Sequence, residues 1–273
     1  MIADLHIHTS ASDGRLSPLE VVQHALEVGL SSIAITDHDT VDAHFELRNE
    51  SGDKAFISKL SIISGIEFST DLPRNEVHIL GYFIDIDNTI LKEQLEVIRN
   101  DRILRSKKMV EKLNKLGYAI DYNRVLEITS GSKSVGRPHV AKALVERGYF
   151  STVSEAFDQV LAKNGPAYVP HYKLAPEQVI KLIKQAGGIA VLAHPGLVGD
   201  DNIVSDLIQS GIQGLEVYHP EHNQEMTDKY LNMAVEHNLK ITGGSDFHAI
   251  PGRFPEKLGI FAISADMVET LSR

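Results

Sequence analysis

The chain has 273 residues, no cysteine and a formal net charge of −10. This length allows one α/β barrel or two smaller domains, and the missing cysteine excludes disulfides, thiolate metal ligands and cysteine nucleophiles. No apolar run approaches the ~20 residues that span a bilayer, and Met1–Asp4 does not resemble a secretory signal. We therefore expect a cytoplasmic protein with no membrane partner, and nothing in the sequence calls for an obligate protein partner.

Seven short apolar runs recur along the chain, and each has His, Asp or Glu at or near one end. These predicted strands cover residues 2–9, 31–36, 60–68, 77–84, 189–193, 214–218 and 239–243. Helical patterns lie between several of them, at residues 18–28, 176–185 and 225–237. Strands that alternate with helices predict βα units and a parallel sheet. Seven such strands predict a closed or nearly closed barrel with its active site at the carboxyl ends of the strands.

A segment between about residues 87 and 169 interrupts this alternation. Its apolar residues recur at helical spacing, as in Met109, Leu113 and Leu116. We therefore predict a barrel formed by residues 1–86 and 170–273, with a mainly helical cap inserted at 87–169. Between Arg99 and Arg147 there are twelve Lys or Arg and five Asp or Glu residues, a net charge of +7. This excess favours a surface that binds anions, although a solvent-exposed helix face is the simpler explanation.

The polar residues near the strand ends are of the types that bind metals. His6 and His8 are two residues apart in a strand, so their side chains face the same way. Glu67 is apolar on both sides, and a buried carboxylate needs a partner or a cation. Imidazole and carboxylate without thiolate suit Zn²⁺, Mn²⁺ or Fe²⁺. Nine such side chains are too many for one ion and suit two or three: His6, His8, Asp13, His38, Glu67, His78, His194, Asp246 and His248.

Taken together, these residues form motifs that resemble those of the polymerase and histidinol phosphatase (PHP) family of metal-dependent phosphoesterases. The motifs are Asp4–His8 with Ser12-Asp13-Gly14, Ile35–Asp39, Gly65–Ser69 with His78, His194-Pro195, and Gly244–His248. The resemblance implies an α/β fold, a distorted seven-stranded (βα) barrel, that holds a trinuclear metal site. Mn²⁺ is the ion we expect first, with Zn²⁺ or Fe²⁺ as alternatives, and metal-activated hydroxide would attack the phosphate ester.

The resemblance also implies a distribution of the ligands over three ions. The first ion would be held by His6, His8, Glu67 and Asp246. The second would be held by Asp13, His38 and His248. The third would be held by Glu67, His78 and His194, so that Glu67 bridges two ions.

Four further segments are similar to one branch of the family, at residues 11–16, 135–139, 165–170 and 191–195. That branch contains 3′,5′-nucleotide bisphosphate phosphatases and a bacterial 5′→3′ exoribonuclease, which implies a nucleotide or short oligonucleotide as substrate. Arg137 is our candidate for binding a second phosphate, because guanidinium offers paired donors, and His139 shares its loop. His219 is predicted to bind phosphate or to protonate the leaving oxygen, and Asp37 is predicted to be catalytic or to orient a ligand.

Three alternatives remain open from the sequence. A metal-dependent amidohydrolase also begins with His-x-His, but it usually places a modified lysine on the fourth strand, where this chain has His78. A histidinol-phosphate phosphatase, or another small-molecule phosphatase, would use the same chemistry on another substrate. A non-catalytic, metal-binding regulatory module would be expected to lose several ligands, whereas here all nine are present.

Overall fold

The computed structural model describes residues 2–50, 57–72, 75–129, 135–163, 165–170, 172, 174–252 and 254–272. The chain divides into two compact units. The barrel unit comprises Met1–Glu93 and Lys173–Arg273, and the helical unit comprises Gln94–Tyr172. Among the described residues, no helix is both long and apolar enough to cross a membrane.

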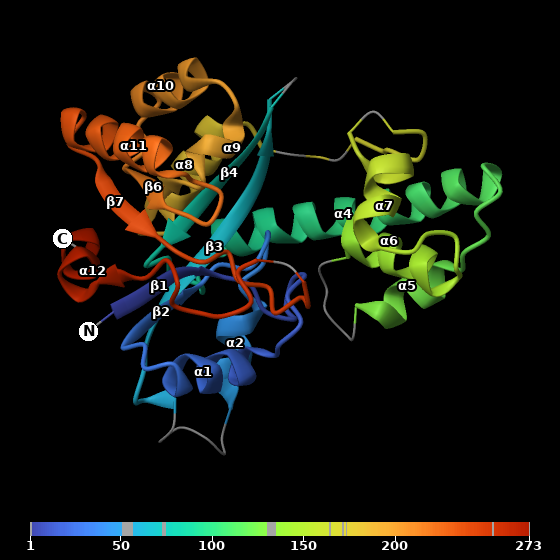
Figure 1. The fold of residues 1–273 in the computed structure, drawn as a ribbon, viewed down its shortest axis with the longest axis horizontal. Coiled ribbons are helices and arrows are strands. Elements are labelled where there is room, and N and C mark those ends of the chain that lie inside the picture. Colours follow the sequence, from blue (N-terminus) through green and yellow to red (C-terminus); the bar gives the residue numbers. More distant parts are fainter. Residues whose placement is uncertain are drawn as a thin grey trace. The chain divides into compact units, whose positions relative to one another are not determined.

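The barrel unit is built on one sheet of eight strands in the order β7-β6-β5-β4-β3-β2-β1-β8 (Figure 1). The strands are β1 (Ile2–Ile7), β2 (Ser32–Ile35), β3 (Ser61–Asp71), β4 (Glu76–Tyr82), β5 (Ile189–Leu192), β6 (Gly214–Tyr218), β7 (Lys240–Gly243) and β8 (Ile263–Ser264). The chain that follows β7 returns to β1, where the Phe247 carbonyl accepts a hydrogen bond of 2.9 Å from the His8 N–H. The sheet is therefore a nearly closed barrel, which confirms the predicted fold class.

The sheet differs from the predicted one in two respects. β8 was not predicted, because two residues are too few to give a pattern, and it lies antiparallel to β1. The prediction of a parallel sheet was wrong for β4, which runs antiparallel to both β3 and β5. The short connection between β3 and β4 permits only a hairpin. An antiparallel strand begins at the edge where its parallel neighbours end, so His78 reaches that edge from the start of β4.

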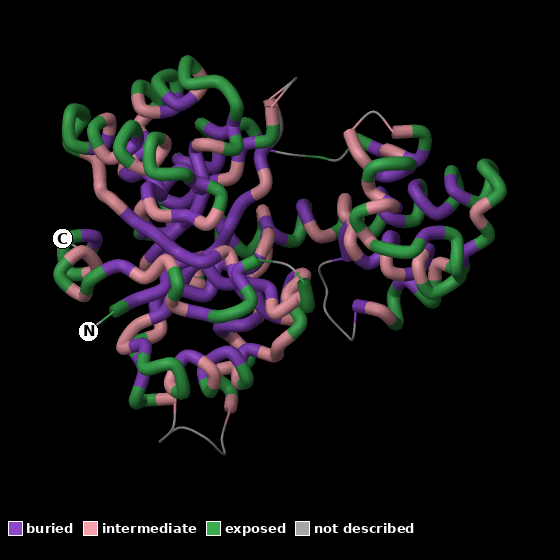
Figure 2. Tube along the Cα trace, in the orientation of Figure 1, coloured by how far each residue is buried: buried purple, intermediate pink, exposed green. Residues whose placement is uncertain are grey.

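Helices cover the outside of the barrel. They are α1 (Pro18–Glu27), α2 (Asp42–Asn49), α8 (Pro176–Gln185), α9 (Pro195–Val198), α10 (Asp201–Gln209), α11 (Gln224–Glu236) and α12 (Ala265–Ser272). α1 begins with a capping box, in which Ser17 Oγ accepts from the Glu20 N–H and the Glu20 carboxylate accepts from the Ser17 N–H. The strands are almost entirely buried, while the outer faces of the helices are exposed (Figure 2).

The helical unit has a core of its own. Most of α4 (Thr89–Lys115) belongs to it, followed by α5 (Tyr122–Ile128), α6 (Arg137–Glu146), α7 (Val153–Ala156) and a π-helical turn, η1 (Phe157–Leu161). Met109, Leu113 and Leu144 are fully buried there. Leu116, which we placed on the same apolar stripe, is exposed, because α4 ends at Lys115.

Candidate metal centre

Glu67 lies at the centre of a group of imidazoles at the carboxyl ends of the parallel strands. Its side chain is buried, with 1% exposed. The Oε1 atom of Glu67 is 2.9 Å from His78 Nδ1 and 3.1 Å from His194 Nε2. The Oε2 atom faces three imidazole nitrogens at 3.0–3.4 Å, those of His38, His8 and His6. The two oxygens of one carboxylate thus face two different sets of histidines.

Two aspartates extend this group on the side of β1. Asp246 Oδ1 is 3.1 Å from His8 Nε2 and 3.5 Å from His6 Nε2. Asp13 Oδ1 is 3.3 Å from His248 Nε2 and 3.8 Å from His8 Nδ1. All nine side chains that we selected from the sequence are therefore brought together in one cluster.

The backbone around the cluster is unusual at three positions. His194 and Asp246 have φ values of 29° and 50°, in a region that residues other than glycine rarely adopt. Gly244 passes directly against β1, so that an added Cβ would lie 2.4 Å from the backbone nitrogen of His6. The glycine thus allows the loop that carries Asp246 to approach His6 closely.

Several buried polar atoms of the cluster lack hydrogen bonds. His6 Nε2, both ring nitrogens of His8 and Glu67 Oε2 form none within the described part of the chain. Leaving such atoms unsatisfied costs about 1–3 kcal/mol each. Potential ligand atoms lie within 4.8 Å of one another in four overlapping groups: His8 with Asp13, His38 and His248; His6 with His8 and Glu67; His38 with Glu67 and His78; and His6 with Glu216 and His219. Imidazole and carboxylate donors in this arrangement fit a cluster of divalent cations.

Within the cluster, neighbouring charges lower the pKa of Glu67 and raise the pKa of His8. Burial opposes ionisation of Glu67, but the surrounding histidines outweigh it and hold the pKa of Glu67 well below its ordinary value. Burial likewise opposes protonation of His8, but Asp246 and Glu67 raise the pKa of His8 to about 10. In the metal-free cluster Glu67 and Asp246 therefore hold a proton on His8, which a cation would replace, whereas burial lowers the pKa of His38 to about 3.

Glu216, in the middle of β6, is a part of the site that we did not predict. It is fully buried; Oε1 lies 2.9 Å from His6 Nδ1, and Oε2 accepts a hydrogen bond of 2.8 Å from the His194 N–H. The ionised carboxylate keeps the proton of neutral His6 on Nδ1, which leaves Nε2 free to bind a cation. The signal was present in the sequence, because Glu216 interrupts an apolar strand just as Glu67 does.

Two other buried aspartates hold loops of the site in place. Asp37 accepts hydrogen bonds from the Thr9 N–H at 2.7 Å, from Thr9 Oγ1 at 2.7 Å and from Ser12 Oγ. Both of its oxygens are thus occupied, and the structure favours positioning of the loop before Asp13 over a direct catalytic role. Asp4 Oδ1 accepts from the Ser245 N–H at 2.9 Å and thereby anchors the loop after β7.

His219, just after β6, presents a hydrogen-bond donor to the cluster. Its Nδ1 accepts a hydrogen bond of 3.2 Å from the Glu221 N–H, so the neutral ring carries its proton on Nε2. Nε2 is buried, lies 3.9 Å from Asp246 Oδ2 and has no hydrogen-bond partner among the described residues. Burial lowers the pKa of His219 to about 4, which keeps the ring neutral.

His222, one turn further along, was also missed by sequence reasoning. Its Nε2 accepts a hydrogen bond of 3.1 Å from the Gly196 N–H, and its Nδ1 lies 2.9 Å from the Val217 carbonyl, to which it donates. The ring thus links the end of β6 to the start of α9, directly after His194. No sequence signal distinguished it from other histidines.

Arg137 and His139 lie at the start of α6 in the helical unit. His139 is buried, and its Nδ1 accepts a hydrogen bond of 3.1 Å from the Gly136 N–H, which caps the helix. The Arg137 guanidinium lies 5.5 Å from the centre of the Phe157 ring. His139 therefore has a structural function, and the predicted substrate contacts of both residues stay predictions.

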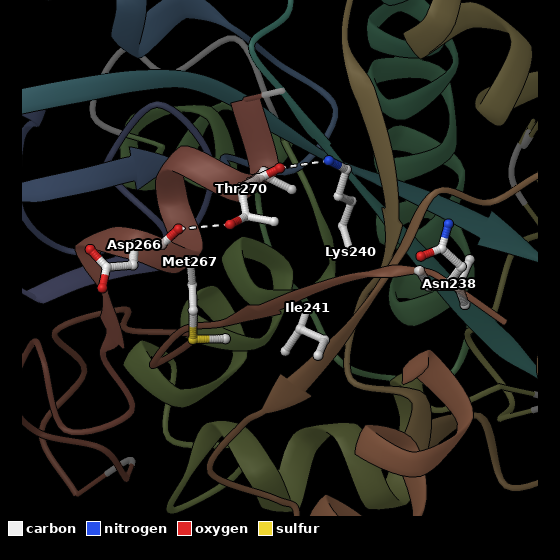
Figure 3. Close-up of a pocket in the computed structure, with 8 residues that line it drawn as sticks. Asn238, Lys240, Ile241, Asp266, Met267 and Thr270 are labelled. Carbon is white, nitrogen blue, oxygen red and sulfur yellow. Dashed lines mark hydrogen bonds between the residues drawn. The ribbon is translucent and has the colours of Figure 1, made fainter. Parts of the chain in front are cut away.

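A separate pocket in the barrel unit takes no part in the cluster. It has a volume of about 340 Å³ and lies between the start of β7 and α12 (Figure 3). Lys240 Nζ donates to the Thr270 carbonyl at 2.6 Å, and Met267 and Ile241 supply apolar lining. β7 begins at this pocket and ends toward Asp246, so the pocket lies at the opposite end of the strand from the metal centre.

A nearly closed barrel with imidazoles and carboxylates gathered at its strand ends defines a metal-dependent hydrolase. The chain belongs to the PHP domain family, whose model matches residues 4–168, and it is a metal-dependent phosphoesterase. The predicted family is thus confirmed. The non-catalytic alternative is therefore set aside.

Three relatives cover most of their own length and of this chain. The chain is 34% identical to the 5′-3′ exoribonuclease Rnm of Salmonella typhimurium over 91% of this chain and 85% of that protein. It is 31% identical to a phosphoribosyl 1,2-cyclic phosphate 1,2-diphosphodiesterase of Eggerthella lenta, over 93% and 97%. It is also 31% identical to a 3′,5′-nucleoside bisphosphate phosphatase of Chromobacterium violaceum, over 94% and 90%.

A solved structure shows the same fold. It comes from Bifidobacterium adolescentis, and its name assigns it provisionally to the metal-dependent phosphoesterases. It is 32% identical in sequence, with a TM-score of 0.88 over 98% of this chain and 94% of that one.

Proposed function

We propose that the chain hydrolyses phosphate esters of nucleotides, by removing a phosphate from 3′,5′-nucleoside bisphosphates, by trimming short RNA from its 5′ end, or by both. The observation that carries this proposal is the cluster around Glu67, in a chain similar over most of its length to an exoribonuclease and to a bisphosphate phosphatase. The excess of positive charge between Arg99 and Arg147 supports a substrate with more than one phosphate.

Within this proposal the nine clustered side chains are the metal ligands. His6, His8, Glu67 and Asp246 would hold one ion; Asp13, His38 and His248 a second; and Glu67, His78 and His194 a third. Two or three ions, Mn²⁺ first among them, would occupy the centre. When bound, such ions supply an activated water and neutralise the oxygens of the phosphoryl group.

The chain's own residues then orient the ligands and the substrate. The two oxygens of Glu67 face different histidines, which suits a carboxylate that bridges two ions. Glu216 keeps the proton of His6 on the far side of its ring. The Nε2–H of His219 is buried and has no hydrogen-bond partner among the described residues, which supports our proposal that His219 donates a hydrogen bond to a phosphoryl or leaving oxygen of the substrate.

A substrate screen in Mn²⁺ tests the proposal. It compares adenosine 3′,5′-bisphosphate, mononucleotides, short 5′-phosphorylated RNA and histidinol phosphate under identical conditions. We expect kcat/KM for the bisphosphate or the RNA to exceed the others by at least about tenfold, which corresponds to roughly 1.4 kcal/mol. A preference for histidinol phosphate, or equal rates on all substrates, would contradict it.

Cleavage of a cyclic phosphate is a second candidate, because the relative from Eggerthella lenta is as similar as the bisphosphate phosphatase. The same screen should therefore include phosphoribosyl 1,2-cyclic phosphate. A clear preference for that compound would replace the nucleotide proposal and leave the metal centre unchanged.

Arg137 is the residue that we propose to bind a phosphate other than the one hydrolysed. A hydrogen bond to a charged group contributes about 1.5–3 kcal/mol, so Arg137→Ala should lower kcat/KM on a bisphosphate by about 10–100-fold. A chromogenic monoester, which has no second phosphate, should be affected much less. Arg124→Ala is the control, because Arg124 is exposed and paired with Glu146. Equal losses of Arg137→Ala on both substrates would assign Arg137 to structure.

A further inference from the structure

β3 extends beyond the point where its regular pairing with β2 ends. The two strands are parallel, and their register ends at Ile35 and Ser64, whereas β3 continues through the metal centre. Alternate residues of a strand present their backbone groups to the same neighbouring strand. Gly65, Glu67 and Ser69 therefore all face the side on which β2 lies. The backbone groups beyond the end of this ladder need other partners.

The chain that follows β2 supplies these partners at and after Glu67. The Glu67 N–H donates to the Asp37 carbonyl at 3.2 Å, and the Glu67 carbonyl accepts from the Asp39 N–H at 2.9 Å. The side chain of Asp39 reaches two residues further, where its Oδ1 accepts a hydrogen bond of 3.0 Å from the Ser69 N–H. Asp39 is 6% exposed, so these hydrogen bonds are shielded from water.

His44, on α2, holds the position two residues before Glu67. Its Nε2 lies 3.0 Å from the Gly65 carbonyl and 3.1 Å from the Ile35 carbonyl, and the Gly65 N–H lies 3.1 Å from the same nitrogen. Two carbonyl oxygens beside one ring nitrogen indicate that Nε2 carries the proton and donates. Burial lowers the pKa of His44, which keeps the ring neutral. His44 thus joins the last residue of β2 to β3.

We propose that Asp39 and His44 are positioning residues that hold the backbone of β3 on both sides of Glu67 and thereby fix its carboxylate between the two sets of histidines. Residues that orient a metal ligand influence metal affinity without contact to the ion. The inference deepens the proposed function and rests on it for the role of Glu67 as a ligand shared by two ions.

Two substitutions of Asp39 separate its carboxylate from its backbone. Asp39 has a φ of 53°, a conformation in which glycine is unstrained and asparagine is tolerated. Asp39→Gly therefore removes the acceptor and permits the same backbone, whereas Asp39→Asn keeps an acceptor oxygen. Mn²⁺ binding is measured by calorimetry without substrate. We expect about tenfold weaker binding in Asp39→Gly and an affinity closer to the wild type in Asp39→Asn.

His44 is tested in the same way. His44→Leu removes the donor and should also weaken Mn²⁺ binding by about tenfold, and His44→Gln, whose amide can donate, should recover part of the affinity. Asp206→Asn and His237→Leu are the controls, because both positions are exposed on helices of the barrel unit or at their ends. Melting temperatures of the metal-free proteins are compared, since a purely structural role would lower them and leave Mn²⁺ affinity unchanged.

A double variant tests whether Asp39 acts through Glu67. Effects of residues that act through one group are not additive. Asp39→Gly combined with Glu67→Gln should therefore bind Mn²⁺ no more weakly than Glu67→Gln alone. Losses that add in the double variant would overturn the inference, as would unchanged Mn²⁺ affinity in both Asp39→Gly and His44→Leu.

The outcome is distinguishable from failure of the proposed function, because Mn²⁺ binding is measured without a substrate. If the wild type hydrolyses nucleotide esters and the Asp39 and His44 variants bind Mn²⁺ normally, only the positioning roles are refuted. If these variants lose Mn²⁺ affinity but the wild type hydrolyses no nucleotide ester, the proposed function fails and the positioning roles stand. A wild type that binds no Mn²⁺ would refute both.

Discussion

Replacing Glu216 with glutamine tests whether a residue outside the nine proposed ligands affects metal binding at the centre. The carboxylate accepts from the backbone of His194 with one oxygen and faces His6 Nδ1 with the other, at 2.8 and 2.9 Å. Glutamine has one oxygen and one NH₂ group. If its oxygen faces His6, the NH₂ group meets the His194 N–H, and two donors collide. If it is flipped, the NH₂ group favours the tautomer of His6 that carries its proton on Nε2, where the cation should bind.

Either orientation costs one charge-assisted hydrogen bond, which is about 1.5–3 kcal/mol. Loss of a group that orients a metal ligand typically costs 10–100-fold in metal affinity or activity, and a tenfold change is about 1.4 kcal/mol. The two estimates agree. We therefore expect Glu216→Gln to weaken Mn²⁺ binding by about 10–100-fold, with a parallel fall in kcat/KM at limiting Mn²⁺.

The assay is an Mn²⁺ titration of activity on a chromogenic phosphate monoester, combined with the metal content after dialysis. Glu146→Gln is the matched control, because Glu146 is an exposed carboxylate of the helical unit. If Glu216→Gln bound Mn²⁺ and turned over within about twofold of the wild type, the orienting role would be refuted.

Three other changes test neighbouring parts of the site. Glu67→Gln should lower metal occupancy and turnover together if Glu67 bridges two ions; near-normal activity in excess Mn²⁺ would argue against a bridge. Because the pKa of His8 is about 10 and that of His6 is well above its ordinary value, both are protonated in the metal-free protein at pH 7. Mn²⁺ binding should then release protons and become stronger as pH rises. Calorimetry at pH 7 in buffers with different heats of ionisation measures this release, because the observed binding heat should depend on the buffer. Binding heats that are independent of the buffer would contradict the prediction. His222→Phe should weaken metal binding by about tenfold, because the Gly196 N–H loses the acceptor that His222 Nε2 provides. His222→Gln should recover part of the affinity. Equal affinity in the wild type and both variants would leave His222 a purely structural residue.

Hydrophobic pattern was enough to locate most of the barrel in the sequence. β6 and α8 have the bounds that were predicted, α1 ends one residue earlier than predicted, and α11 both begins and ends one residue earlier. The direction of β4 was not predictable from its own residues, because an apolar run has the same pattern in either direction. It followed instead from the short connection to β3, and that direction brings His78 to the cluster.

The candidate ligands could be selected from the sequence because charged groups beside apolar strands need partners. The same reasoning should have selected Glu216, which stands between Leu215 and Val217. A search of strand ends does not include Glu216, because this residue contacts His6 from within β6. His222 could not have been found, since its function depends on the distance between two loops that meet only in the fold.

The measurement that tests the metal centre most directly is a crystal structure of the protein loaded with Mn²⁺, with the ions located by anomalous scattering. We predict two or three ions among the nine clustered side chains, with ligand bonds near ~2.0–2.2 Å and with Glu67 shared between two of them. Ions bound elsewhere would contradict the proposed centre. So would ligand side chains that remain more than about 6 Å apart when metal is supplied, because a ligand bond is only ~2.0–2.2 Å long.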